Sequence, residues 1–116
     1  MRVTIKTEEF QYVAGLFKRE PRWKVICGIE FTDEELAIIR KRNLGDLHIY
    51  TRQIGNGAED NVNLNQVVKQ GIWSVYLTPV DAQNFEHELT TSLLPSLKNY
   101  ITASAEVSSA AKVLEF

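Results

Sequence analysis

The sequence offers few side chains that could act as a nucleophile. Its single cysteine, Cys27, alternates with Val25 and Ile29, so it falls on the apolar side of a predicted strand. A reactive thiol needs a neighbouring base and a lowered pKa, and an apolar strand face provides neither. We therefore predict that Cys27 is a packed, unreactive thiol.

The two histidines, His48 and His87, are the natural candidates for metal ligands. A metal site would bring them together with carboxylates. His87 stands between Glu86 and Glu88, and three consecutive residues of a helix point in different directions, so this triplet does not form a chelate. The chain also has no phosphate-binding loop and no zinc-ligand spacing. We predict no metal site and no cofactor.

A mixed polar set of side chains falls on one face of three predicted strands. Glu30, His48 and Tyr50 are the only plausible acid–base group in this set. An ordinary solvated face with a Glu30–Arg52 pair is one interpretation. Apolar neighbours on the same face would form an exposed patch, which is typical of a self-association surface. The candidate binding face comprises Glu30, His48, Tyr50, Arg52, Ser74 and Tyr76.

One short segment, residues 18–24, is basic and contains an aromatic residue. Such a cluster can contact phosphates while the indole ring stacks on a base. A solvated turn beside a strand is the plainer interpretation. The candidate basic patch comprises Lys18, Arg19, Arg22, Trp23 and Lys24.

The overall charge argues against nucleic acid as a partner. The 116 residues include 13 Lys and Arg against 15 Asp and Glu, a net charge of −2, so the basic excess of a typical nucleic-acid binder is absent. A single cysteine cannot form an intrachain disulfide. No apolar run approaches a signal peptide or the roughly 20 residues of a membrane span. We expect a cytoplasmic protein that does not contact membranes.

These side chains must be positioned by strands and helices that the sequence pattern predicts. Period-two alternation predicts strands over residues 23–31, 46–52 and 72–78. The polar, glycine-rich residues 55–61 predict a flexible loop, and residues 64–70 suit either a short helix or a loop. The side chains expected to face the helices are Val25, Cys27, Ile29, Phe31, Leu47, Ile49, Trp73, Val75 and Leu77.

Two helices are predicted from the capping residues at their N-termini. Thr32 with Glu35 forms a capping box that predicts a helix over 33–43, which Gly45 would end in the left-handed conformation. Thr78, followed by proline, predicts the start of the longest helix, with an apolar stripe that reaches residue 101. Pro95 inside this stripe should kink the helix, or mark a restart capped by Ser92.

The two ends of the chain predict further strands. The N-terminal residues favour a strand that runs into a hairpin with its turn within 15–21, although Phe10, Val13 and Phe17 also have helical spacing. Residues 112–116 are predicted to form a short final strand.

Together these elements predict one domain over residues 1–116, of the α+β class. We expect a two-layer, mainly antiparallel sheet of four to five strands with two main helices on one face. The favoured function is a non-enzymatic protein-interaction module that self-associates as a homodimer through a sheet face or a strand edge, with another protein partner possible. The alternatives are a nucleic-acid-binding accessory protein that uses residues 18–24 and a small enzyme with an acid–base group on the sheet face.

Overall fold

The computed structural model describes the backbone of residues 1–113 and the side chains of residues 1–104. It confirms the α+β class, with five strands that all pair in antiparallel fashion. The elements are β1 (Arg2–Val13), β2 (Arg19–Glu30), α1 (Asp33–Lys41), β3 (His48–Ile54), β4 (Ala58–Asn63), α2 (Leu64–Gln70), β5 (Ile72–Tyr76), α3 (Pro79–Glu88), the π-helical segment η1 (Leu89–Leu93) and α4 (Leu94–Val113).

The strands divide into two sheets rather than one. β1, β2 and β5 form a three-stranded sheet with β2 in the centre, and β3 pairs with β4 in a separate hairpin. β3 still lies beside β5, but side chains replace the backbone ladder between them. The Tyr50 hydroxyl donates to the Trp73 carbonyl and accepts from the Trp73 N–H, both at 2.8 Å. The Ser74 hydroxyl accepts from the Gln53 N–H at 3.3 Å.

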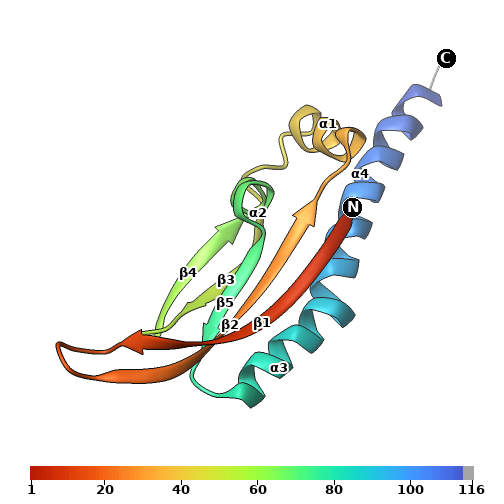
Figure 1. Cartoon of the computed structure of the whole chain (residues 1–116). Coiled ribbons are helices and arrows are strands. Elements are labelled where there is room, and N and C mark those ends of the chain that lie inside the picture. Colours follow the sequence, from red (N-terminus) through yellow and green to blue (C-terminus); the bar gives the residue numbers. More distant parts are fainter. Residues whose placement is uncertain (114–116) are drawn as a thin grey trace.

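A single helical rod covers one face of the three-stranded sheet (Figure 1). α3, η1 and α4 follow one another without a break; α3 packs on β2 and β5, and α4 packs on α1. This burial of apolar surface is the main stabilising contribution in the fold. The fully buried apolar residues are Val25, Cys27, Leu64, Val67, Ile72, Ala82 and Leu89.

Pro95 does not end the rod. The Leu94 N–H donates to the Leu89 carbonyl five residues earlier, so a wider π-helical segment directly precedes the proline. Such segments are one of the usual ways in which a helix adjusts its hydrogen-bond ladder. Ser92 lies inside η1, and the prediction that it caps a new helix is wrong.

The faces of β5 are the reverse of those predicted. Ile72 pairs with Cys27 and Ser74 pairs with Val25, so both lie on the side that the helices cover, and both are fully buried. Trp73 points to the opposite side and is only half-buried. A shift of one residue moves every side chain of a strand to the other face, and a strand that is apolar on both sides does not show which face is inside.

Three local predictions also need correction. Asn43, with φ of 55°, takes the left-handed position after α1, where Gly45 was expected. Residues 58–61 belong to β4 rather than to a loop, because a tight turn with Gly57 at φ of 84° and an Asn56 side chain that accepts from the Ala58 N–H closes the hairpin. Residues 112–113 lie in α4, not in a final strand, and residues 114–116 lie outside the described part of the chain.

Residues 64–70 form the short helix α2, one of the two structures that the sequence allowed. The Asn63 side chain caps it by accepting from the Gln66 N–H at 3.0 Å, while the Gln66 side chain accepts from the Asn63 N–H at 2.9 Å. This capping box satisfies backbone donors that the first turn of a helix leaves free. α2 therefore connects β4 to β5 as an ordered element.

The predicted N-terminal hairpin is confirmed, and its outer part projects from the rest of the molecule (Figure 1). β5 pairs only with residues 23–27 of β2, so residues 10–22 pair only across the hairpin itself. We call residues 10–22 the arm. Its turn is shorter and earlier than predicted, since the Ala14 N–H donates to the Lys18 carbonyl and β2 begins at Arg19. The arm contributes to the length of a molecule that measures 71 × 23 × 20 Å.

Candidate functional site

The structure does not place the six predicted face residues on one open surface. Tyr50, Arg52 and Ser74 are buried, with 7%, 9% and 0% of their surfaces exposed. Tyr76 is half-buried with its ring centroid 5.4 Å from that of Phe85. The helical rod covers this side of β5, because the strand presents the opposite face from the one predicted. The open polar face is therefore wrong as a geometric prediction, and the exposed residues that remain of it are Glu30 and His48.

The candidate acid–base group is not brought together. Glu30 lies opposite Arg2 of β1, whereas His48 lies opposite Asn63 of β4. The Tyr50 hydroxyl is occupied by the backbone of the neighbouring strand, and burial raises its pKa. Within the described residues, no hydrogen bond joins any two of these three side chains. A phenol held in this way stabilises the contact between β3 and β5.

Arg52 does not pair with Glu30 as the sequence suggested. Its guanidinium donates to the Asp60 carboxylate across the β3–β4 hairpin and lies 4.3 Å from the centre of the Trp73 ring. The Lys24 ammonium lies 4.5 Å from the centre of the same ring. The Arg52 contact joins β3 to β5 and so links the two sheets, whereas the Lys24 contact lies within the three-stranded sheet; Lys24 and Trp73 lie on the side of this sheet away from the helical rod.

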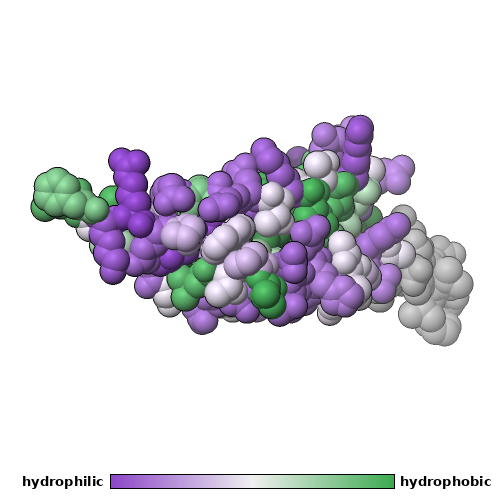
Figure 2. Space-filling view, turned by 60° about the horizontal axis from the view of Figure 1, so that its bottom comes forward, coloured by the Kyte–Doolittle hydropathy of each residue, from purple (hydrophilic) through white to green (hydrophobic). Residues whose placement is uncertain are grey.

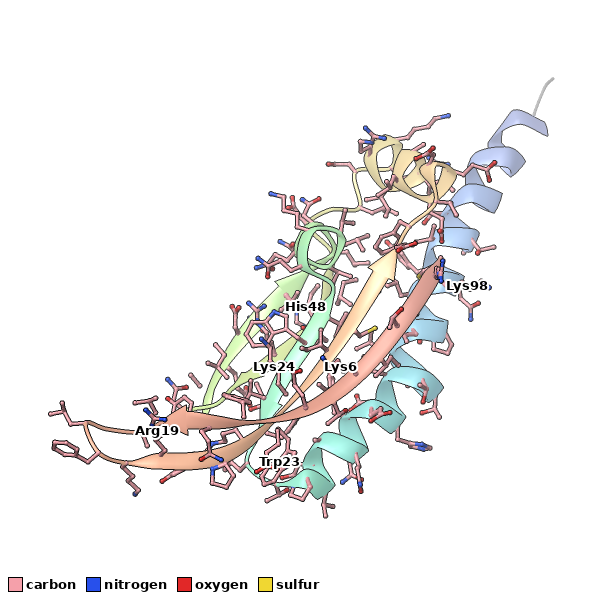
Figure 3. All side chains as sticks on the ribbon, viewed as in Figure 1. Lys6, Arg19, Trp23, Lys24, His48 and Lys98 are labelled. Carbon is pink, nitrogen blue, oxygen red and sulfur yellow. The ribbon has the colours of Figure 1, made fainter. Side chains whose placement is uncertain are left out.

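Strand alternation separates the members of the basic patch. Trp23 pairs with Tyr76 on the helical side, and Arg22 and Lys24 point to the other side. The Arg22 guanidinium donates to Glu20 at 2.5 Å and to the Gly55 carbonyl at 3.2 Å. Figure 3 shows Arg19 out on the arm, away from Trp23 and Lys24. The basic residues that remain at the outer end of the arm are Lys18 and Arg19.

Cys27 is packed as predicted. The side chain is fully buried, and this burial raises the pKa of the thiol to about 11. The described residues contain no cluster of three or more potential metal ligands. Among the same residues, no helix is long and apolar enough to cross a membrane.

The most exposed apolar side chains lie at the tip of the arm. Phe17 is 100% exposed, Leu16 is 95% exposed and Val13 is 64% exposed. In Figure 2 an apolar patch forms one end of the molecule, where the arm projects. The sequence carried a signal for this site, because Leu16 and Phe17 are two large apolar residues inside a predicted turn, where polar residues usually lie.

The base of the arm rests on the body of the protein. The Tyr12 ring packs so closely on the turn between β3 and β4 that a Cβ atom added to Gly55 would lie 3.1 Å from it. The Arg22 guanidinium covers the same ring at 5.2 Å from its centre and bonds the Gly55 carbonyl. These contacts fix the direction in which the arm leaves the body, while the residues beyond Tyr12 continue outward.

An open groove of about 900 Å³ begins at this same turn. β3 and the end of β5 form one wall, and the helical rod forms the other. Apolar side chains line its floor, including Ile49, Leu77, Phe85 and Leu93. The rim on the helical side is polar, because residues spaced three or four apart on a helix share one face. These rim residues are Asp81, Asn84, Glu88, Ser92 and Ser96.

The groove is acidic. Asp81 and Glu88 contribute carboxylates, and the described residues that line the groove include no lysine and no arginine. Among these described residues, His48 is the one basic side chain. The arrangement suits an apolar ligand that carries positive charge, since clefts lined by one sign of charge attract the other.

Comparisons of the chain with protein-family models, with curated proteins and with solved structures find no match. The arm and the groove are therefore the features from which a function can be argued.

Proposed function

We propose that the chain is a non-enzymatic interaction module that self-associates into a homodimer through the arm. The observation that carries this proposal is the exposure of Leu16 and Phe17 at the end of a projecting hairpin. Apolar residues scattered singly over a surface are ordinary, but large apolar side chains gathered at one point mark interaction sites. A phenylalanine gives such a contact considerable apolar area, since aromatic side chains bury roughly 150–250 Å² each.

The arm is a better contact element than a strand edge. β1 is an outer strand of the described three-stranded sheet and offers a long edge for pairing. Its side chains, however, include Arg2, Lys6, Glu8 and Glu9. Charged residues along an edge discourage pairing with another chain. The sheet face is also a poor contact element, because the helical rod covers one side and cation–π contacts occupy the other.

The alternatives have less support from the placement of their residues. An enzyme would need free acid–base groups, but Tyr50 bonds the backbone of Trp73 and Cys27 is buried. Nucleic-acid binding would need a continuous basic surface, but Arg22 is paired with Glu20 and Lys24 lies over Trp73. Apolar contact through the arm uses side chains that have no other role in the described structure.

Sedimentation equilibrium tests this proposal. The unmodified chain is expected to dimerise as its concentration rises, and Leu16→Glu/Phe17→Glu is expected to weaken the dimer by about 30-fold or more, as removal of a central apolar contact does. Gln83→Glu/Asn99→Glu is the matched control, because it adds two negative charges at exposed helical positions away from the arm and the groove lining. This control should dimerise like the unmodified chain.

Three outcomes would overturn the proposal. One is a chain that stays monomeric at every concentration. Another is a tip variant that dimerises as well as its control does. The third is a monomeric chain that sediments with vesicles of phosphatidylcholine and phosphatidylserine through its tip, which would make the arm a membrane contact instead.

A further inference from the structure

We infer that the groove receives the arm of a second copy, so that two chains exchange arms. The inference rests on the proposed function and names the surface that the arm contacts. It joins two surfaces of the described structure: the exposed apolar tip of the arm and the groove lined by apolar side chains. Both belong to the same chain, so a second copy of that chain supplies each of them to the other.

The apolar parts of the two surfaces match. The tip presents Leu16 and Phe17, which are almost entirely exposed. The groove presents Leu77 and Tyr100, which are 58% and 41% exposed, and Phe85 and Leu93 lie in the same lining. An aliphatic and an aromatic side chain entering this groove would cover exposed apolar surface on both partners, which favours association.

The charges of the two surfaces are opposite. The arm carries three cationic side chains, those of Lys18, Arg19 and Arg22, against the single carboxylate of Glu20. The groove carries the carboxylates of Asp81 and Glu88 on its helical rim. Arg19 is exposed and forms no ion pair within the described residues, so it is available to a carboxylate of another chain. Complementary charge of this kind speeds encounter and sets orientation.

The dimensions of the two surfaces are compatible. The strand part of the arm, from Phe10 to Val13, extends roughly 10 Å at the usual rise of a strand, and the turn of residues 14–18 lies beyond it. The helical wall of the groove from Asp81 to Tyr100 extends roughly 28 Å at the usual rise of a helix. An arm can therefore lie along the groove without passing its far end. A two-fold pair would place each arm in the groove of the other chain, which closes the assembly at two copies.

The arm cannot fill the groove of its own chain in this structure. Gly55 lines the groove and also supports Tyr12 and Arg22 at the base of the arm. The arm thus begins at one end of the groove and points away from the body (Figure 3). An arm that enters the groove therefore has to come from another molecule.

Disulfide trapping between two full-length variants tests this arrangement. One chain carries Phe17→Cys, and a second, distinguished by a tag, carries Asn84→Cys in the groove rim. The native Cys27 is buried and does not compete. Gln83→Cys is the matched control, because it is exposed on the same helix one residue away but does not line the groove. A disulfide forms only when the two Cβ atoms approach to about 4 Å, so the reaction reports contact.

The inference predicts a mixed disulfide between positions 17 and 84 that forms at least about tenfold faster than that between 17 and 83, since disulfide geometry is specific. Equal rates for 83 and 84, or disulfides only between two copies of position 17, would overturn the groove as the acceptor while self-association through the arm would stand. A chain that forms no mixed disulfide and sediments as a monomer would overturn both proposals.

A charge exchange gives a second, independent test. Glu88→Lys is expected to weaken the dimer about tenfold, and Arg19→Glu is expected to do the same, because each places like charges across the interface. The two changes together should restore most of the affinity. Gln83→Lys is the control for added charge on the helix and should leave the dimer unchanged. Additive losses in the double variant would show that the two side chains do not meet, and would overturn the inference.

Discussion

The two halves of the β1–β2 hairpin share one ladder of backbone hydrogen bonds, but they differ in their neighbouring strands and in the burial of their side chains. In the inner half, β2 is paired on both sides, by β1 and β5, and the helical rod covers Val25 and Cys27 completely. In the outer half, residues 10–22 pair only with each other, and the apolar side chains of Leu16 and Phe17 at the tip are almost entirely exposed to water.

This difference shows that apolar residues contribute differently to stability in the two halves. Burial of a large apolar side chain contributes roughly 1.5–3 kcal/mol to folding, so the inner residues maintain the fold. Leu16 and Phe17 contribute no such burial in a single chain. Their apolar surface is a cost to solubility unless another surface covers it.

Hydrogen exchange should show the largest contrast between the two halves. In the monomeric variant Leu16→Glu/Phe17→Glu, the amides of residues 25–27 should open only with global unfolding, at about 5–15 kcal/mol, while those near the arm tip should open at close to zero. The measurement is amide exchange followed by NMR or mass spectrometry. Protection of the arm tip equal to that of the central strand would show that the arm belongs to the cooperative core.

The same substitution in each region gives the next contrast. Leu89→Ala removes a fully buried side chain from the helical rod and should lower the free energy of unfolding by about 2–5 kcal/mol. Leu16→Ala, at the exposed tip, should change it by less than about 0.5 kcal/mol in the monomer. Urea denaturation at low protein concentration measures both. A loss of 2 kcal/mol or more at Leu16 would mean that the tip packs within its own chain.

Two tyrosines make a finer comparison. Tyr50→Phe removes the hydroxyl that satisfies both backbone groups of Trp73, and it should lower the free energy of unfolding by about 1–3 kcal/mol. Tyr12→Phe in the arm should have an effect below about 0.5 kcal/mol, because its ring, rather than its hydroxyl, makes the contacts with Gly55 and Arg22. If thermal unfolding shows equal losses for both, the hydroxyl bridge between the sheets is not the cause.

Alkaline pH should affect the body through the half-buried phenol of Tyr76. Burial raises the pKa of this side chain from 10.0 to about 12, so the folded state keeps a proton that the unfolded state has already released. The stabilisation is therefore complete below pH 10 and is lost as the pH rises toward 12. Unfolding by urea at several pH values should show a decline that is smaller in Tyr76→Phe. A decline of equal size in both would assign it to other groups.

The sequence predicted the elements that have strong local signals. The capping box of Thr32 and Glu35 formed as expected, as did the Thr78 cap of the long helix. Alternation identified β2 because the charged residues Lys24 and Glu30 share one face, while the other face is apolar throughout residues 23–29. In each of these cases, the residues of the element and its cap were sufficient to predict the secondary structure.

The candidate site was harder to predict because it depends on which face of each strand packs on the helices and on which strands lie side by side. In β5, Ile72 and Trp73 are both large and apolar, so the pattern does not reveal which of them faces the helices. Because of this ambiguity, Ser74 and Tyr76 were predicted to lie on an open sheet face. In the structure Ser74 is buried and Tyr76 is half-buried, both on the side that the helical rod covers. The groove could not be predicted from the sequence either, because its lining residues come from β3 and from α3 and α4, which are far apart along the chain.

The environment of position 17 tests the central claim most directly. A dye that responds to polarity, attached to Phe17→Cys, should shift its emission to shorter wavelength as the protein concentration rises, with the same midpoint as the increase in mass measured by light scattering. This result would place the arm tip in an apolar site of the dimer. An unchanged emission while the mass doubles, or a mass that never rises above that of one chain, would contradict self-association through the arm.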